Sequence, residues 1–296
     1  MKIIDAFEQS CENLKANKIE NYKSSCFILF CKVLKKDKAW LFAHFDDEMG
    51  QSYLNEIEAG IKKLSKNMPA HYVTEEKEFM SLLFHVEPSV LIPRCETELL
   101  TEKIIAYCKK NNMNAPDILE LGTGSGCICV SLAYNIRNAN IISADISQDA
   151  LETAKKNVEK YKLGNRVTLL NKDMLKRETY LETSKLTRGN KFDIILSNPP
   201  YIISGDICNL EPGVREYEPL IALDGGDDGL KFYKAIAKNS SEVLKQDGHI
   251  FLEAGFDTAK PAAEIFENFG FKTAIIKDYE DNDRLIICEK NSGNRF

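Results

Sequence analysis

The chain has 296 residues, of which 44% are hydrophobic and 28% charged, a composition typical of a globular protein with one large domain and a smaller one. Its formal net charge of −6 argues against broad, sequence-independent binding to nucleic acid, because such binding depends on cations placed at the phosphates. No apolar run approaches the roughly 20 residues of a membrane span, and no signal peptide is evident.

The nine cysteines are scattered and show no spacing typical of a metal site or a disulfide framework. We therefore expect reduced thiols, a cytoplasmic location and no bound metal. Neither a membrane nor a stably bound nucleic acid is an expected partner.

Residues 1–68 carry apolar side chains that recur at helical spacing. Three stretches show it, from Ile3 to Leu14, from Cys26 to Leu34 and from Tyr53 to Leu64. The pattern predicts a small N-terminal helical bundle.

Pro69 interrupts this pattern and begins a predicted linker over residues 69–97. From Phe79 to Ile92 the sequence becomes rich in strand-forming residues, with Glu87–Ser89 as the expected turn. The linker is therefore predicted to form a β-hairpin.

Arg94 and Thr97 lie where the linker meets the next predicted helix, over residues 98–110. Thr97 is a candidate N-cap for that helix. Two roles stay open for Arg94: a structural salt bridge, which is the commoner one, or positioning of an active-site wall.

Residues 98–296 alternate between strand and helix patterns, which predicts an α/β fold with a seven-stranded, mostly parallel sheet covered by helices on both faces. The expected strands are Asp117–Leu121, Asn140–Asp145, Arg166–Leu170, Phe192–Ser197, His249–Glu253, Thr273–Ile276 and Leu285–Glu289. The further expected helices are 125–136, 147–161, 228–245 and 258–269. A short polar loop joins the last two strands, so we expect the final strand to insert antiparallel.

A glycine-rich loop follows the first strand and precedes a helix, and its residues are Gly122, Thr123, Gly124, Ser125 and Gly126. Glycines let the backbone turn tightly and approach a ligand, with helix N–H groups directed at it. A dinucleotide fingerprint would need glycine at position 127, which is Cys127, so the GxGxG spacing favours a nucleoside without a pyrophosphate there. Asp145 ends the second strand, where a carboxylate can accept both ribose hydroxyls. Its simpler alternative is an N-cap before Ser147.

The tetrapeptide Asn198-Pro199-Pro200-Tyr201 follows the strand Phe192–Ser197. Two prolines end that strand abruptly and hold the backbone extended, since neither has an N–H for a neighbouring strand. Ligands bind at this edge of open α/β sheets, although Asn-Pro is also an ordinary turn starter.

Together these features resemble class I S-adenosylmethionine (SAM) methyltransferases of the amino-methylating kind, and more closely the PrmC/HemK family of release-factor glutamine methyltransferases. The similar segments are LIPRCETE at Leu91–Glu98, LELGTGSGCI at Leu119–Ile128, ADIS at Ala144–Ser147, FDIILSNPPYI at Phe192–Ile202, YEPLIALDGGDDGL at Tyr217–Leu230 and DNDRLIIC at Asp281–Cys288. The similarity covers residues 69–290.

The resemblance implies a Rossmann-like SAM-methyltransferase domain over residues 98–296. It also implies methyl transfer from SAM to the glutamine side-chain nitrogen in the Gly-Gly-Gln motif of peptide chain release factors. Residues 1–68 are then expected to recognise the protein substrate, and the simpler alternative is that the bundle only covers apolar surface on the catalytic domain.

The resemblance also assigns roles to site residues. The Asn198 side-chain oxygen and the Pro199 carbonyl would accept the two amide hydrogens, with Pro200 completing the corner and Tyr201 packing on the amide. The expected SAM-binding residues are Gly122, Thr123, Gly124, Ser125, Gly126, Asp145, Met174 and Asn198. For Met174, a contact with the adenine and an apolar core role both stay open.

The chain departs from the family pattern at four positions. The family usually has proline at Cys95, aspartate at Glu120 and phenylalanine at Tyr217, and glycine near Glu75. The tetrapeptide is untouched, so only the geometry of the linker is in question.

Other functions stay open at this point. A DNA adenine or cytosine amino-methyltransferase would use the same tetrapeptide, but no target-recognition region or basic groove is evident. A glutamine of another protein, such as a ribosomal protein, is a further possible substrate. Cys127 disfavours a nicotinamide dehydrogenase, and a non-catalytic binding module would leave the tetrapeptide unexplained.

Overall fold

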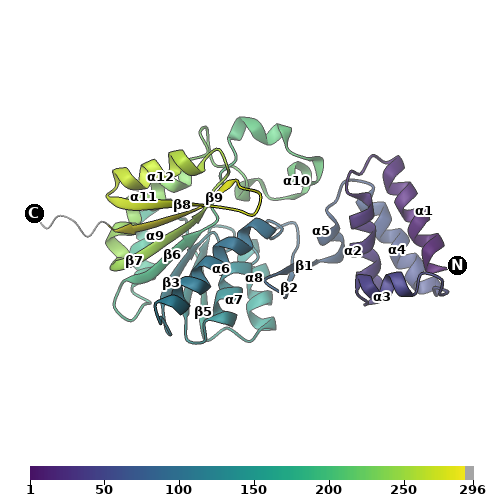
Figure 1. The fold of residues 1–296 in the computed structure, drawn as a ribbon, viewed down its shortest axis with the longest axis horizontal. Helices are drawn as coiled ribbons and strands as arrows, with labels where there is room; N and C mark the ends of the chain where they lie inside the picture. Colours follow the sequence, from purple (N-terminus) through teal and green to yellow (C-terminus); the bar gives the residue numbers. More distant parts are fainter. Residues whose placement is uncertain (291–296) are drawn as a thin grey trace, which may run out of the picture. The chain divides into compact units, whose positions relative to one another are not determined.

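The computed structural model describes residues 1–290, and within them the chain forms two compact units (Figure 1). One unit comprises Met1–Lys77 with two further segments, Val86–Pro88 and Leu210–Glu218. The other comprises Glu78–His85, Ser89–Asn209 and the chain from Pro219 onward. The division into 1–68, 69–97 and 98–296 stays a prediction.

The N-terminal unit is helical and has an apolar core of its own. Its helices are α1 (Ile3–Ala16), α2 (Tyr22–Leu34), α3 (Lys38–Ala43), α4 (Gln51–Leu64), α5 (Ala70–Thr74) and α10 (Pro212–Tyr217). The three predicted apolar stripes lie on α1, α2 and α4, and their buried residues form one cluster. The segment that carries α10 joins this unit from far along the chain, and the Tyr217 hydroxyl donates a 2.7 Å hydrogen bond to the Lys66 carbonyl.

A two-stranded hairpin follows α5, formed by β1 (Glu76–Phe79) and β2 (Leu82–His85). The hairpin was predicted, but the position of its turn was wrong. The chain reverses at Met80 and Ser81, which both have positive φ, and Glu87–Ser89 follows the second strand. Prolines and glycines mark turns in a sequence, whereas this turn uses residues that carry no such signal.

The second unit is built on a seven-stranded sheet in the order β5-β4-β3-β6-β7-β9-β8. The strands are β3 (Asp117–Leu121), β4 (Asn140–Asp145), β5 (Val167–Asn171), β6 (Phe192–Ser197), β7 (Leu244–Glu253), β8 (Phe271–Lys277) and β9 (Asp283–Lys290). The first five are parallel, and β9 inserts antiparallel between β7 and β8, as predicted.

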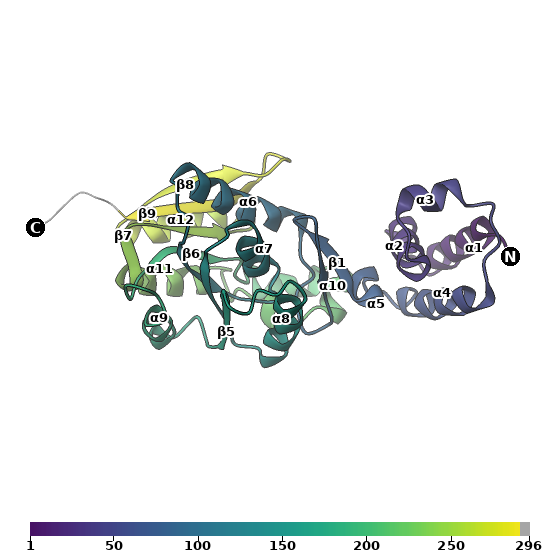
Figure 2. The ribbon, with the colours of Figure 1, turned by 90° about the horizontal axis from the view of Figure 1, so that it is seen from below.

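Helices cover both faces of this sheet (Figures 1 and 2). One face carries α6 (Cys95–Lys110), α7 (Cys127–Asn135) and α8 (Gln148–Lys160), and the other carries α9 (Arg177–Ser184), α11 (Lys231–Val243) and α12 (Ala259–Asn268). Successive strand residues point to opposite faces, so Ile118 packs in one apolar cluster and Leu119 in the other. Burial on both faces explains why the strands read as continuous apolar runs.

The start of α6 corrects the expectation for Thr97. The helix begins at Cys95, with Arg94 in the N-cap position, so Thr97 lies in its first turn and is not the cap. Cys95 occupies the first helical position, which is also where proline is tolerated best in a helix.

The strand order changes direction between β3 and β6, and this arrangement places the functional loops. From β3 the chain moves outward to β4 and β5, then returns to the other side of β3 with β6. Leu121 and Ser197, the last residues of β3 and β6, are register partners. The loop after β3 and the tetrapeptide after β6 therefore leave the sheet side by side, at a topological switch point.

Candidate active site

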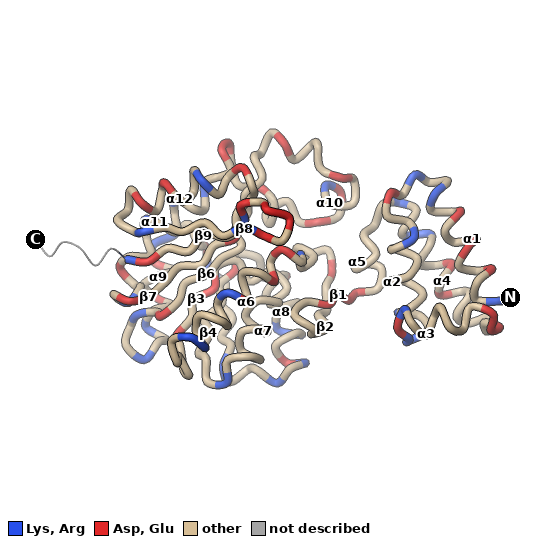
Figure 3. The backbone as a smooth tube through the Cα atoms, viewed as in Figure 1, with Lys and Arg blue, Asp and Glu red and all other residues tan. Residues whose placement is uncertain are grey.

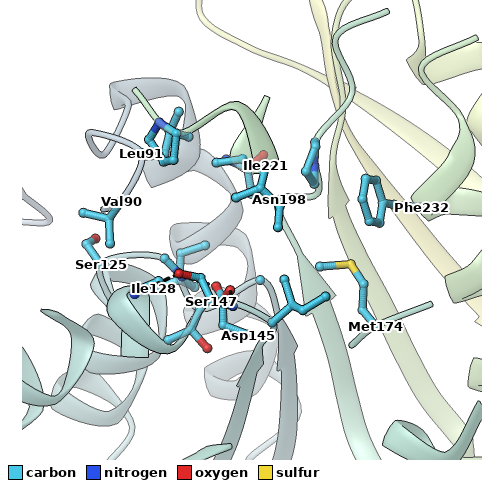
Figure 4. Close-up of a pocket in the computed structure, with 18 of the residues that line it drawn as sticks. Val90, Leu91, Ser125, Ile128, Asp145, Ser147, Met174, Asn198, Ile221 and Phe232 are labelled. Atoms are coloured by element: carbon cyan, nitrogen blue, oxygen red, sulfur yellow. Dashed lines mark hydrogen bonds between the residues drawn. The ribbon is translucent and has the colours of Figure 1, made fainter. Parts of the chain in front are cut away.

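A pocket opens at the carboxyl ends of β3, β4 and β6 and lies entirely within the second unit (Figure 4). Its wall includes residues of the glycine-rich loop, Asp145, Met174, Asn198 and Pro200. Apolar side chains complete it, among them Leu91, Ile128, Ile146, Ile221 and Phe232. The result is an apolar cleft with a few polar groups, the usual construction of a small-molecule site.

The three loop glycines all have positive φ: 87° at Gly122, 53° at Gly124 and 77° at Gly126. A Cβ atom at Gly122 would lie 3.3 Å from Met174 Cε, and one at Gly126 would lie 3.1 Å from Ala154 Cβ. At Gly124 the same position meets no atom within 4 Å. Gly122 and Gly126 therefore allow tight packing, whereas Gly124 presents bare backbone to open space, as close approach of a ligand requires.

Asp145 bonds to the glycine-rich loop through one carboxylate oxygen and to the start of α8 through the other. Oδ2 accepts the Gly124 N–H and Oδ1 accepts the Ser147 N–H, each at 2.9 Å. The side chain that caps α8 is that of Ser147, which accepts the Ala150 N–H at 3.2 Å, so Asp145 is not the N-cap. Burial raises the pKa of the Asp145 carboxyl, while the backbone N–H bonds lower it. An ionised carboxylate can accept about four hydrogen bonds, so Asp145 retains capacity for the hydroxyls of a ligand.

A buried carboxyl lies beneath the loop. Ser143 donates its hydroxyl hydrogen to Glu120, and the Thr123 and Ser143 hydroxyl oxygens are 2.7 Å apart. Burial raises the pKa of Glu120 to about 7. Thr123 is thus connected to Glu120 through Ser143, and the loop is supported from below by a titratable group.

Asn157 supports the loop from the side. Its Nδ2 donates to the carbonyl oxygens of Ser125 and His85, each at 2.9 Å, and its Oδ1 accepts the His85 N–H at 2.8 Å. One fully buried amide therefore ties the glycine-rich loop to β2.

The tetrapeptide is held to the sheet and to α6. The Ser197 hydroxyl, just before it, donates to the Leu121 carbonyl at 2.6 Å. Asn198 Nδ2 donates to the Thr97 hydroxyl oxygen at 3.1 Å. The amide nitrogen of Asn198 is thereby engaged with α6, which leaves its Oδ1 directed elsewhere.

Glycines of the segment after η2 (Leu220–Ala222) pack against the backbone of the last two tetrapeptide residues. A Cβ atom at Gly225 would lie 2.7 Å from Tyr201 Cα, and one at Gly229 would lie 2.5 Å from the Tyr201 carbonyl oxygen. The Ile202 N–H also donates to the Leu223 carbonyl at 3.0 Å. Burial raises the pKa of Tyr201 to about 12, so its phenol stays protonated at neutral pH.

The structure brings most of the predicted site residues to one pocket, but not all of them. Those that line it are Gly122, Thr123, Gly124, Ser125, Asp145, Met174, Asn198 and Pro200. Gly126, Pro199 and Tyr201 are not among the residues that line it. Arg94 also lines the pocket.

Thr97, which bonds to Asn198, and Glu253, which lies at the same edge of the sheet, were not predicted as site residues. Thr97 was considered only as a helix cap, and Glu253, at the end of β7, was not considered. An acidic residue at the carboxyl end of a parallel strand was the available signal for Glu253, as it was for Asp145.

Two parts of the chain match the models of known protein families. Residues 109–283 match the family described as a methyltransferase domain, and residues 5–74 match the PrmC N-terminal domain.

Named relatives align over nearly the whole chain. The release factor glutamine methyltransferase of Clostridium acetobutylicum is 40% identical over 289 residues, which is 97% of this chain and 98% of that protein. The protein of the same name from Clostridium botulinum is 38% identical and covers 94% of this chain and 95% of its own length. A crystal structure of a release factor-specific protein-(glutamine-N5) methyltransferase from Alicyclobacillus acidocaldarius is 28% identical, with a TM-score of 0.43, and covers 70% of this chain and 99% of its own.

Proposed function

The chain belongs to the release factor glutamine methyltransferase family, and from that membership we propose that it transfers a methyl group from SAM to a glutamine side-chain nitrogen in the Gly-Gly-Gln motif of peptide chain release factors. The observation that carries the proposal is the meeting of the glycine-rich loop and Asn198 in one pocket. A Cβ atom at Gly122 would lie only 3.8 Å from the Asn198 carbonyl oxygen. The loop proposed to bind SAM is thus adjacent to Asn198, the residue proposed to hold the glutamine nitrogen.

The residues present fit SAM. Gly124 offers bare backbone, Asp145 has acceptor capacity for ribose hydroxyls, and Met174 with Ile146 supplies apolar surface for an aromatic base. When bound, SAM supplies a methyl group on a positively charged sulfur, which is a strong electrophile. The protein's task is then to hold a weak nucleophile in line with that methyl group.

Asn198 is the residue proposed to position the nucleophile. An amide nitrogen reacts poorly because its lone pair is delocalised into the carbonyl. Since Asn198 Nδ2 is bonded to Thr97, its Oδ1 can accept a hydrogen from the substrate amide. A fixed acceptor at this nitrogen favours the positive charge that develops there during transfer. Pro199 is not among the residues that line the pocket, and the acceptor role of its carbonyl stays a prediction.

Proton removal needs no strong base in this scheme. The methylated amide nitrogen becomes acidic enough to lose its proton readily. Tyr201 stays protonated and cannot act as a base near neutral pH. Its ring is proposed to pack on the substrate amide.

The N-terminal unit is proposed to dock the protein substrate. A single glutamine has too few atoms to distinguish one protein from another, so selectivity must come from contacts remote from the reacting amide. The unit has its own core and matches the PrmC N-terminal domain, which supports a separate role.

The DNA alternative is less well supported. Figure 3 shows acidic residues gathered at the β8–β9 turn, which contains Asp278, Glu280 and Asp281. Together with the net charge of −6, these acidic residues disfavour extended contact with a phosphate backbone.

One experiment tests the proposal directly. The protein is incubated with labelled SAM and an intact release factor, and the methyl group is located by fragmentation mass spectrometry. Methylation of the Gly-Gly-Gln glutamine is expected. Label on DNA or on another protein alone would contradict it.

The cytoplasmic location of the protein and its part in translation termination stay predictions. Among residues 1–290 no helix is both long and apolar enough to cross a membrane, and no group of acidic, His and Cys side chains could hold a metal ion.

A further inference from the structure

Asn198 is bonded to a residue that no part of the proposed reaction uses. Its Nδ2 donates to Thr97 Oγ1 at 3.1 Å, and the two residues are 101 positions apart in the chain. Thr97 is only 3% exposed, so water does not replace this contact freely. The orientation of the Asn198 amide therefore depends on what Thr97 can accept or donate.

Thr97 in turn contacts a buried carboxyl. The Thr97 side chain lowers the pKa of the Glu253 carboxyl, as a hydrogen-bond donor to it would. Glu253 is 2% exposed, and its Oε2 has no hydrogen-bond partner among residues 1–290. Ser197 and Leu252 are register partners on β6 and β7, so Asn198 and Glu253 follow them at the same edge of the sheet.

The donors and acceptors on Glu253, Thr97 and Asn198 determine which way the Asn198 amide is oriented. An ionised carboxylate only accepts hydrogen bonds, so a bond between Thr97 and ionised Glu253 would use the single hydrogen of the Thr97 hydroxyl. Thr97 can then only accept from Asn198, which must present its NH₂ group to Thr97 and its Oδ1 to the opposite side. We propose that Glu253 and Thr97 are positioning residues, which together hold the Asn198 side-chain oxygen ready for the substrate amide.

This inference rests on the proposed function, because it matters only if Asn198 Oδ1 accepts from the substrate. A protonated Glu253 could donate to Thr97 and release the Thr97 hydrogen toward Asn198, which would allow the amide to reverse. Burial raises the pKa of Glu253 to about 7, while Thr97, Arg284 and Arg94 lower it and Glu96 raises it. Tyr201 also faces this carboxyl, and the Tyr233 hydroxyl donates to the Glu253 backbone carbonyl at 2.8 Å.

The test is Glu253→Gln, which keeps the shape of the side chain but lets it donate to Thr97. At saturating SAM, kcat should fall by up to about 100-fold, as expected when a reacting group is misplaced. The Kd for SAM, measured by calorimetry, should stay within about twofold of wild type. In wild type kcat should rise with pH through about 7 as Glu253 ionises, and in Glu253→Gln this rise should be absent.

A matched pair at Thr97 covers the case in which Glu253→Gln does not fold. Thr97→Val removes the hydroxyl at constant volume and should lower kcat, whereas Thr97→Ser keeps it and should restore most activity. Wild-type kcat and an unchanged pH profile in Glu253→Gln, or equal kcat in the Val and Ser variants, would overturn the inference.

Asn198→Ala separates this failure from failure of the proposed function. If Asn198→Ala keeps full turnover, the proposed site is wrong. If it loses turnover while Glu253→Gln and Thr97→Val do not, only the positioning role is wrong.

Discussion

The Ser197 hydroxyl donates a 2.6 Å hydrogen bond to the Leu121 carbonyl, and the two residues are register partners at the ends of neighbouring parallel strands. Both are fully buried. The bond is made one residue before the glycine-rich loop on β3 and one residue before Asn198 on β6. It therefore fixes the distance between the proposed SAM-binding loop and the proposed catalytic amide.

Asp145→Ala should weaken SAM binding strongly. Two charge-assisted hydrogen bonds to the ribose would be lost, each worth roughly 1.5–3 kcal/mol, so affinity should fall roughly 100-fold or more. Asp149→Ala is the matched control, because it removes an exposed acid of the same helix region that does not line the pocket. Calorimetry measures both. Equal affinities for two folded variants would remove Asp145 from the SAM site.

Asn198→Ala should act on the reaction more than on SAM binding. Turnover at saturating substrates should fall roughly 100-fold or more, as for loss of one preorganised polar contact. SAM affinity should change much less, because Asn198 is proposed to hold the amide. Collapse of SAM binding with surviving turnover would instead assign Asn198 to the SAM site.

Gly124→Ala should weaken SAM binding without unfolding the protein. Because Gly124 has a positive φ, an alanine there should lower the free energy of unfolding by about 1 kcal/mol. Its new Cβ would occupy the open space above the loop. SAM affinity should fall roughly 10-fold or more. Gly270→Ala is the control, because Gly270 also has a positive φ and a Cβ added there would meet no atom within 4 Å. This variant should lower the stability of the protein but leave its SAM affinity unchanged. Identical SAM affinity in the two variants would show that Gly124 does not face the ligand.

Glu120→Gln should alter the pH dependence of stability. The pKa of Glu120 is about 7 in the folded protein and near 4.5 when unfolded, so the folded state holds more protons between these values. The unfolding free energy should therefore fall as pH rises from about 4.5 to 7, by on the order of 3 kcal/mol for this group. In Glu120→Gln the decline should be smaller, and the part due to Glu253 should remain. Chemical denaturation at several pH values checks this, and parallel curves for the two proteins would contradict it.

Removal of residues 1–68 should impair methylation of an intact release factor. The second unit keeps both of its apolar clusters, so it should fold and bind SAM. Loss of a second contact surface should lower kcat/KM on the release factor by about 100-fold. A short glutamine peptide, which cannot reach a second surface, should be methylated equally by both forms. Undiminished activity on the intact factor would refute docking, and failure to fold would favour a covering role for the bundle.

The sequence was most informative where apolar runs end at clear turn signals. The bounds of β3, β4 and β6 agree with the predicted strands at both ends. The short helix α9 and the 3₁₀ turn η1 (Ser204–Asn209) were not predicted, because few residues and mixed polarity give no period to detect. The hairpin turn was misplaced because Met80 and Ser81 adopt positive φ without glycine.

By itself, the sequence determined the strands, the GxGxG loop, Asp145 and the tetrapeptide, since each depends on residues close together in the chain. Only the tertiary structure decided which strands are neighbours and therefore which loops share a pocket. It also decided that Thr97 bonds to Asn198 and that Glu253 lies at the same edge of the sheet, although α6, β6 and β7 are far apart in sequence. The physical reason is that local periodicity encodes the type of an element, whereas the order of a sheet follows from the packing of all its layers at once.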